Sequence, residues 1–203
     1  MAILTANNQS LTEITSLPSG VSGGALVLLA TETASSSSTV EFDSDIDDTY
    51  DEYVFKFYDI HPSASGEQLS FQGNAAGGSG YNETITSSFF RAVHLEDDSD
   101  QTLAYVTGSD LAQATGFQPL TQEIKNDADS SASGELWLFS PSSTTFVKHF
   151  MSSNNIMHTD PQSSYHAVAG YFNITSAIDE IQFKMSSGNI DAGTFKLYGI
   201  KDS

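Results

Sequence analysis

The sequence predicts an all-β protein, an antiparallel β-sandwich of jelly-roll type with about nine strands and an extended N-terminal arm. Apolar side chains occupy every second position in many short segments from residue 39 onward. This alternation is typical of strands that bury one face. No segment sustains the 3.6-residue apolar stripe of an amphipathic helix over about ten residues. Without helices to cover a parallel sheet, short antiparallel strands are expected to pack as two facing sheets.

Residues 1–38 are expected to form the arm. They are rich in Ser, Thr, Gly and Asn and contain two apolar runs, 11–17 and 25–30. The serine run 35–38 predicts a hinge that would let the arm pack on a neighbouring subunit. Residues 39–203 are then one jelly-roll-like domain, because a chain of 203 residues with 38% hydrophobic content supplies a single core.

The clearest strands lie near the two ends of this domain. In 52–60 three aromatic residues share one face. In 181–185 apolar residues alternate with polar ones, and the turn sequence 187–189 leads to a second alternation at 195–197, which predicts a C-terminal hairpin. Further strands, rich in Thr, Tyr, Phe and Val, are expected at 67–75, 83–95, 102–106, 135–140, 144–151 and 165–174. A helical turn is expected at 109–115.

The charge balance argues against several partners. Seven basic residues stand against 26 acidic ones, a formal net charge of −19. Phosphate backbones and anionic lipid surfaces would be repelled, so neither nucleic acid nor a membrane is expected. The sequence has no signal-like or membrane-spanning apolar run and no cysteine. We expect a soluble protein, made in a cytoplasm and stabilised by packing, whose macromolecular partners present a basic face.

The acidic run 41–52 raises the hypothesis of a calcium site. It holds seven carboxylates and no basic residue. Asp43, Asp45 and Asp47 imitate the start of an EF-hand loop, but the glycine and the closing glutamate of that loop are missing. A different calcium site would combine these aspartates with carboxylates of 96–100, relieving their mutual repulsion. The alternative is a solvated acidic loop that protects a strand edge from aggregation. No other cofactor is expected.

Candidate catalytic residues are few. Ser22 in the string 20–24 matches the G-x-S-x-G pattern of a hydrolase, but a strand-like run follows where the nucleophile elbow needs a helix. No two histidines have the i, i+4 spacing of a helical zinc site, and His94 with Glu96 forms an i, i+2 pair. Carboxylates are so numerous that no glycosidase pair stands out. The protein is therefore predicted to have no catalytic residues and not to be an enzyme.

Two aromatic positions bear on glycan binding. Exposed aromatic rings can stack on sugar rings. Tyr81, in the glycine-rich loop 76–81, is the exposed candidate for such a contact. Trp137 lies in the middle of an expected strand, so we expect it to pack in the core.

Three strings of the chain resemble small virion-associated structural proteins of marine and aquatic tailed bacteriophages. They are YDEYVFKFYDIHP at 50–62, AAGGSGY at 75–81, and the most specific one, IDEIQFKMSSGNI followed by GTFKLYGI, at 178–190 and 193–200. The similarity runs from about residue 40 to residue 200 and leaves 1–38 unmatched. The resemblance implies a jelly-roll-like protein on the phage particle and carries over no catalytic residues.

We therefore expect a non-enzymatic structural component of the virion exterior. A capsid decoration (cement) protein is favoured over a tail or fibre-attachment protein, because the chain has no coiled-coil or β-helical shaft. A glycan-binding module for host recognition is a further alternative. The expected partners are phage virion proteins, either the major capsid protein or a tail protein, and further copies of the chain in a homo-oligomer, with a trimer favoured. Binding at repeated symmetric sites would gain strength from multivalency.

Overall fold

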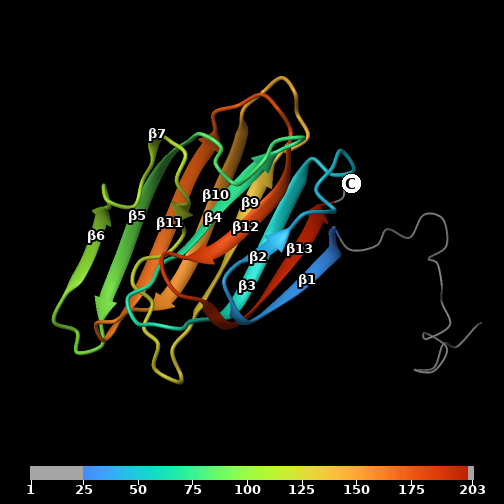
Figure 1. Ribbon diagram of the computed structural model, residues 1–203. Helices are drawn as coiled ribbons and strands as arrows, with labels where there is room; N and C mark the ends of the chain where they lie inside the picture. The colour runs from blue at the N-terminus through green and yellow to red at the C-terminus, as the bar shows by residue number, and fades with distance from the viewer. Residues whose placement is uncertain (1–24, 201–203) are drawn as a thin grey trace, which may run out of the picture.

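The computed structural model describes residues 25–200, which form two antiparallel sheets packed face to face (Figure 1). These residues contain strands and no helix. The predicted all-β sandwich is therefore confirmed. The smaller sheet covers the middle of the larger one, and strands β6 and β1 lie at the two edges of the larger sheet (Figure 1).

The larger sheet has nine strands, eight of them in one continuous order. The order is β1 (Leu26–Ser37), β13 (Ile190–Ile200), β3 (Glu52–Pro62), β9 (Ala132–Phe139), β10 (Lys148–Met157), β11 (Gln162–Phe172), β5 (Ile85–Leu95) and β6 (Gln101–Tyr105), with β7 (Ala112–Ala114) also pairing with β5. The smaller sheet has the order β2 (Val40–Phe42), β12 (Ile178–Met185), β4 (Leu69–Ala75) and β8 (Gln118–Pro119).

Aromatic side chains fill the space between the two sheets. The ring of Phe183 in β12 lies 5.5 Å from that of Phe55 in β3 and 5.1 Å from that of Phe195 in β13, measured between centroids. Phe71 of β4 meets Phe150 of β10 edge to face at 5.0 Å. All five rings are buried, and each contributes about 1.5–3 kcal/mol by leaving water. Side chains at the alternate positions of β3, β13 and β10 point away from the core, to the outer face of the larger sheet.

Every segment predicted as a strand overlaps an observed one, but the described residues contain 13 strands instead of the about nine expected. Three of the extra strands, β2, β7 and β8, have only two or three residues, too few for alternation to show. The predicted helical turn at 109–115 is wrong. Residues 112–114 form β7, which pairs with Ile85 and Thr86 of β5.

The predicted C-terminal hairpin is also wrong. β12 pairs with β2 and β4 in the smaller sheet, whereas β13 pairs with β1 and β3 in the larger one. The turn between them carries the chain from one sheet to the other, with Gly188 in the left-handed region at a φ of +67°. Phe183 and Phe195 therefore face each other across the core. Alternation indicated which side of each strand is apolar, but not the sheet that each strand joins.

The predicted boundary of the arm at residue 38 needs correction. Residues 26–37 form β1, an edge strand that pairs with β13 from Leu26 to Ser37. Ala34 is buried, and the Ser36 hydroxyl donates a hydrogen bond of 2.8 Å to Asp191. The expected serine hinge therefore overlaps the end of a strand. Residues 1–24 lie outside the described part of the chain.

Candidate functional site

The outer face of the larger sheet, turned away from the smaller sheet, carries several large apolar side chains. Cross-strand pairing sets Trp137 beside Val54 on one side and Met151 on the other, and sets Phe90 beside Tyr105. We call this surface the outer band. It comprises Tyr198, Lys196, Val54, Lys56, Glu135, Trp137, Met151, Ser153, Tyr165, Ala167, Ala169, Ser88, Phe90, Ala92, Leu103 and Tyr105.

Several apolar members of the outer band are open to solvent. Leu103 is 80% exposed, Met151 57%, and Phe90 and Tyr105 45% each. The rings of Phe90 and Tyr105 pack edge to face at 5.0 Å. Together with Leu103 they form a row of exposed side chains along β5 and β6. We call Phe90, Leu103 and Tyr105 the ridge. Contiguous exposed apolar surfaces are common at interaction sites.

Beside the ridge the outer band is hollowed. Ala167 and Ala169 of β11 and Ser88 of β5 have short side chains and form the floor, while Trp137 and Met151 form the opposite wall. This hollow has a volume of about 400 Å³. It adjoins a second one of about 360 Å³, with which it shares Ser88, Met151 and Ala169. The hollow arises because side chains on one face of a sheet stand side by side, so short ones between long ones leave a depression.

The outer band is almost neutral in a strongly acidic chain. Its charged residues are Lys56, Lys196 and Glu135, whereas the whole chain carries −19. The Lys56 Nζ lies 3.4 Å from the Glu135 Oε2, so two of these three charges form an ion pair. Such a partly exposed pair adds little to folding stability. It does allow another molecule to cover the band without burying two unpaired charges.

The expectation that Trp137 packs in the core is wrong. Leu136 and Leu138 on either side of it are buried in the core, so alternation turns Trp137 outward, where it is half-buried. Its ring lies nearly parallel to that of Phe139, at an interplanar angle of 14° and a centroid separation of 6.5 Å. The run from 136 to 139 is apolar throughout and hides the alternation. The charged residue Glu135, two positions before Trp137, was the available signal for the outward face.

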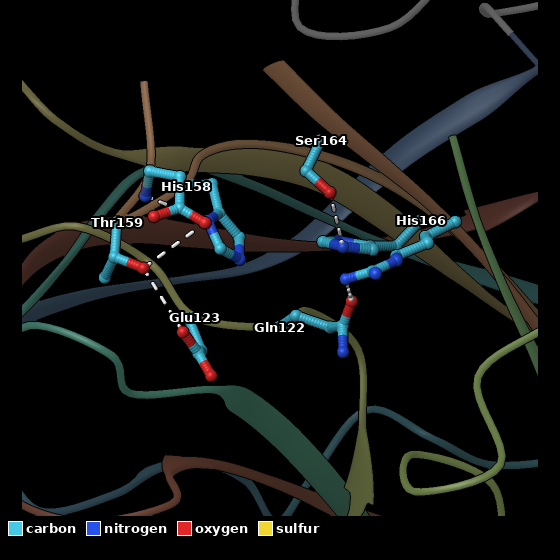
Figure 2. A network of polar contacts seen from close by, with 8 residues as sticks. Gln122, Glu123, His158, Thr159, Ser164 and His166 are labelled. Carbon is cyan, nitrogen blue, oxygen red and sulfur yellow. Dashed lines mark hydrogen bonds and ion pairs between the residues drawn. The ribbon is translucent and has the colours of Figure 1, made fainter. Parts of the chain in front are cut away.

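A cluster of polar side chains lies in the interior beside β11 (Figure 2). Ser164 and His166 are both fully buried, and the Ser164 Oγ lies 3.0 Å from the His166 Nε2. Arg91 of β5 donates a hydrogen bond of 2.9 Å from its Nη1 to the Gln122 Oε1. The Arg91 Nε and the His166 Nδ1 are buried without a hydrogen-bond partner among the described residues. Each such atom carries a desolvation cost.

Ser164 and His166 have the residue types of a nucleophile and its base, but their surroundings suit a structural role. Both side chains are 0% exposed, so a substrate would have to enter the packed interior. Burial, with the nearby charges of His158 and Arg91 acting in the same direction, lowers the pKa of His166 to about 3. The ring is therefore neutral at pH 7. Within residues 25–200, the His166 Nδ1 meets no carboxylate that would orient the ring.

His158 extends the same cluster toward the surface. Its Nδ1 accepts a hydrogen bond of 3.0 Å from the Asp160 backbone N–H. Burial lowers the pKa of His158, against the opposing effect of Asp160 and Glu123. The adjacent Thr159 hydroxyl donates a hydrogen bond of 3.2 Å to the Glu123 Oε2 (Figure 2). These contacts tie the turn between β10 and β11 to the segment that follows β8.

The calcium hypothesis concerns Asp43, Asp45 and Asp47. All three lie in the loop between β2 and β3. Hydrogen bonds from the Thr49 backbone N–H at 2.8 Å and the Tyr53 hydroxyl at 3.1 Å engage the Asp47 carboxylate. The Thr49 contacts hold the pKa of Asp47 below its usual value. Between residues 25 and 200, no three His, Asp or Glu side chains are arranged to hold a metal ion.

The second loop of that hypothesis, 96–100, is the turn between β5 and β6. Four strands separate β3 from β6 in the larger sheet. The prediction of a calcium site shared by the two loops is therefore wrong. His94 does not pair with Glu96 but lies 3.0 Å from Asp98 across this turn. Calcium binding by the three aspartates themselves stays a prediction.

Tyr81 is half-buried. Burial, together with the negative charges of Glu41 and Glu180, raises the pKa of Tyr81 well above its usual value. Its ring is thus less open than the ridge aromatics, and glycan binding through Tyr81 stays a prediction. Ser22, the candidate nucleophile, lies outside the described residues.

No protein-family model, curated protein or solved structure matches the chain. Residues 25–200 include no helix with the length and hydrophobicity that a membrane span requires. Residues 25–200 thus form a β-sandwich whose larger sheet carries exposed apolar side chains on its outer face.

Proposed function

We propose that this protein is a non-enzymatic structural component on the exterior of a tailed-phage particle, where it serves as a capsid decoration protein. The observation that carries the proposal is the outer band, a wide, nearly neutral apolar face on a rigid sandwich. A face of this kind suits stable contact with other proteins. The three strings that resemble virion-associated proteins support a place on the particle.

The setting of the polar side chains supports a role without catalysis. The Ser164–His166 pair is sealed in the interior, and the hollow in the outer band is lined chiefly by apolar and small residues. An active site would instead bring titratable groups together in an open pocket. At these two places the surroundings favour contact over chemistry.

The net charge of −19 supports a capsid or tail protein with a basic face as the partner on the particle. Further copies of the chain are the second kind of partner that we propose. Attachment at repeated sites would strengthen binding through multivalency.

Mass spectrometry of purified particles, combined with electron microscopy of particles labelled with an antibody to this chain, tests the proposal. We expect the chain to be present in particles and the label to cover the head. A label confined to the tail would replace decoration with tail or fibre attachment. Absence of the chain from particles would refute a structural role altogether.

Host glycan recognition, the other role expected from the sequence, is tested separately with the purified chain on a glycan array. Specific hits that disappear in the Tyr81→Ala variant would establish that role. An array without hits would dismiss it. Neither result bears on whether the chain is carried by particles.

A further inference from the structure

We propose that the outer band is a self-complementary contact between two copies of this chain, in which the ridge of each copy enters the hollow of the other. The inference rests on the proposed structural role, because a component that assembles needs a contact between copies. It is nevertheless a property of the purified chain and does not require the particle.

The first argument is shape. The ridge and the hollow lie side by side on one face, since Phe90 of the ridge also lines the hollow and β6 is separated from β11 only by β5. At about 4.8 Å per strand, β6 lies about 10 Å from β11 across the sheet, and Leu103 is level with Ala92 and Tyr165, beside the floor of the hollow. Consider a second copy related by a two-fold axis that lies in the contact plane, midway between the ridge and the hollow. This axis places the ridge of each copy opposite the hollow of the other. A second copy therefore offers both the projection and the depression that this surface needs.

The second argument is charge. Two copies that each carry −19 repel one another on approach through most of their surface. The outer band is an exception, because Lys56 and Glu135 form an ion pair and Lys196 adds one positive charge. Lys196 lies over the ring of its neighbour Tyr58, 5.7 Å from the centroid. Contact through the band thus keeps the acidic surfaces apart. Salt should strengthen this contact by screening the repulsion that remains.

The third argument is that four hydroxyls of the band already have partners within the chain. The Ser153 and Tyr165 hydroxyls lie 3.2 Å apart, and the Tyr105 hydroxyl donates a hydrogen bond to Asp110. The Ser88 hydroxyl points to a backbone oxygen of β11 at 3.4 Å. A saccharide would need free donors and acceptors at the hollow. An apolar protein surface can cover these paired groups without leaving them unsatisfied.

Sedimentation of the full chain tests the contact. We expect a dimer whose dissociation constant falls as salt is raised. Leu103→Asp on the ridge and Ala169→Glu in the hollow should each raise that constant by at least ~10-fold, as expected for loss of one buried leucine contact. Phe146→Asp is the matched control, because Phe146 is 72% exposed but lies in the loop between β9 and β10, off the band. This variant should dimerise like the wild type.

Cysteine cross-linking tests the pairing of ridge with hollow directly, since the chain has no cysteine of its own. A mixture of the Leu103→Cys and Ala169→Cys variants should form a disulfide-linked dimer on mild oxidation. A mixture of Leu103→Cys and Phe146→Cys should not. Circular dichroism checks that each variant is folded.

A monomeric wild-type chain would overturn the proposal. So would a dimer or trimer that survives both Leu103→Asp and Ala169→Glu, or a dimer that does not form the 103–169 cross-link. None of these outcomes depends on particles, so failure here is separable from failure of the proposed function. Conversely, a chain that dimerises as described but is absent from particles would retain this contact and lose the proposed location.

Discussion

Lowering the pH below about 6.5 should destabilise this protein, because His166 is held in its neutral form in the interior. The folded chain takes up a proton at His166 only near its lowered pKa of about 3, whereas the unfolded chain does so near the ordinary histidine value of 6.5. The unfolded state therefore binds more protons between these two values. Stability is fully present above pH 6.5 and is lost as the pH falls toward 3.

The size of this loss follows from proton linkage. Each pH unit below the unfolded-state pKa costs about 1.36 kcal/mol, so at about pH 5 the contribution from His166 is about 2 kcal/mol. The pKa of His158 is also lowered by burial, which acts in the same direction. A variant that removes only the titration of His166 is therefore needed to measure how much of the pH-dependent loss of stability comes from this residue.

Urea unfolding at about pH 7.5 and about pH 5 measures this share as a change in the free energy of unfolding. His166→Gln removes the titrating ring while its amide can still hydrogen-bond the Ser164 hydroxyl. The wild type should lose about 2 kcal/mol more than this variant between the two pH values. His94→Gln, which replaces an exposed histidine, should behave like the wild type. Equal losses in the wild type and His166→Gln would refute the reasoning.

Three further perturbations have defined outcomes. Gly170→Ala should lower the free energy of unfolding by about 1–3 kcal/mol, because the new methyl would lie 2.6 Å from the Thr86 backbone oxygen; chemical denaturation measures it. Tyr53→Phe should cost about 1 kcal/mol in the same assay, since the Tyr53 hydroxyl bonds the carboxylate and backbone of Asp47. Millimolar calcium should raise the melting temperature if loop 43–51 binds the ion; an unchanged temperature would dismiss the calcium site.

The strands and several of their buried faces were predictable because aromatic residues mark one side of strands such as β3. Tyr53, Phe55 and Phe57 share a face in the sequence pattern, and all three are buried in the core. The local signal ends there. Whether β12 and β13 lie in one sheet or in two depends on contacts between Phe183 and Phe195 across the core, which no spacing within either strand reveals.

The candidate sites were less predictable for the same reason. Ser164 and His166 look like the solvent side of a half-buried strand, yet both are fully buried. The segment after β8 folds against this region, since Leu120 accepts a hydrogen bond from Asn154 and Ile124 pairs with His158. The outer band is likewise assembled from seven strands, so it emerges only when their register is known.

The contribution of the outer band to assembly on the particle is measured most directly by quantitative mass spectrometry of particles grown with variant chains. Leu103→Asp and Phe146→Asp add the same charge at exposed apolar positions, one on the band and one off it. The account predicts that particles carry the Phe146→Asp chain at the wild-type copy number and the Leu103→Asp chain at a strongly reduced one. Particles that carry both variants at the wild-type copy number would contradict it.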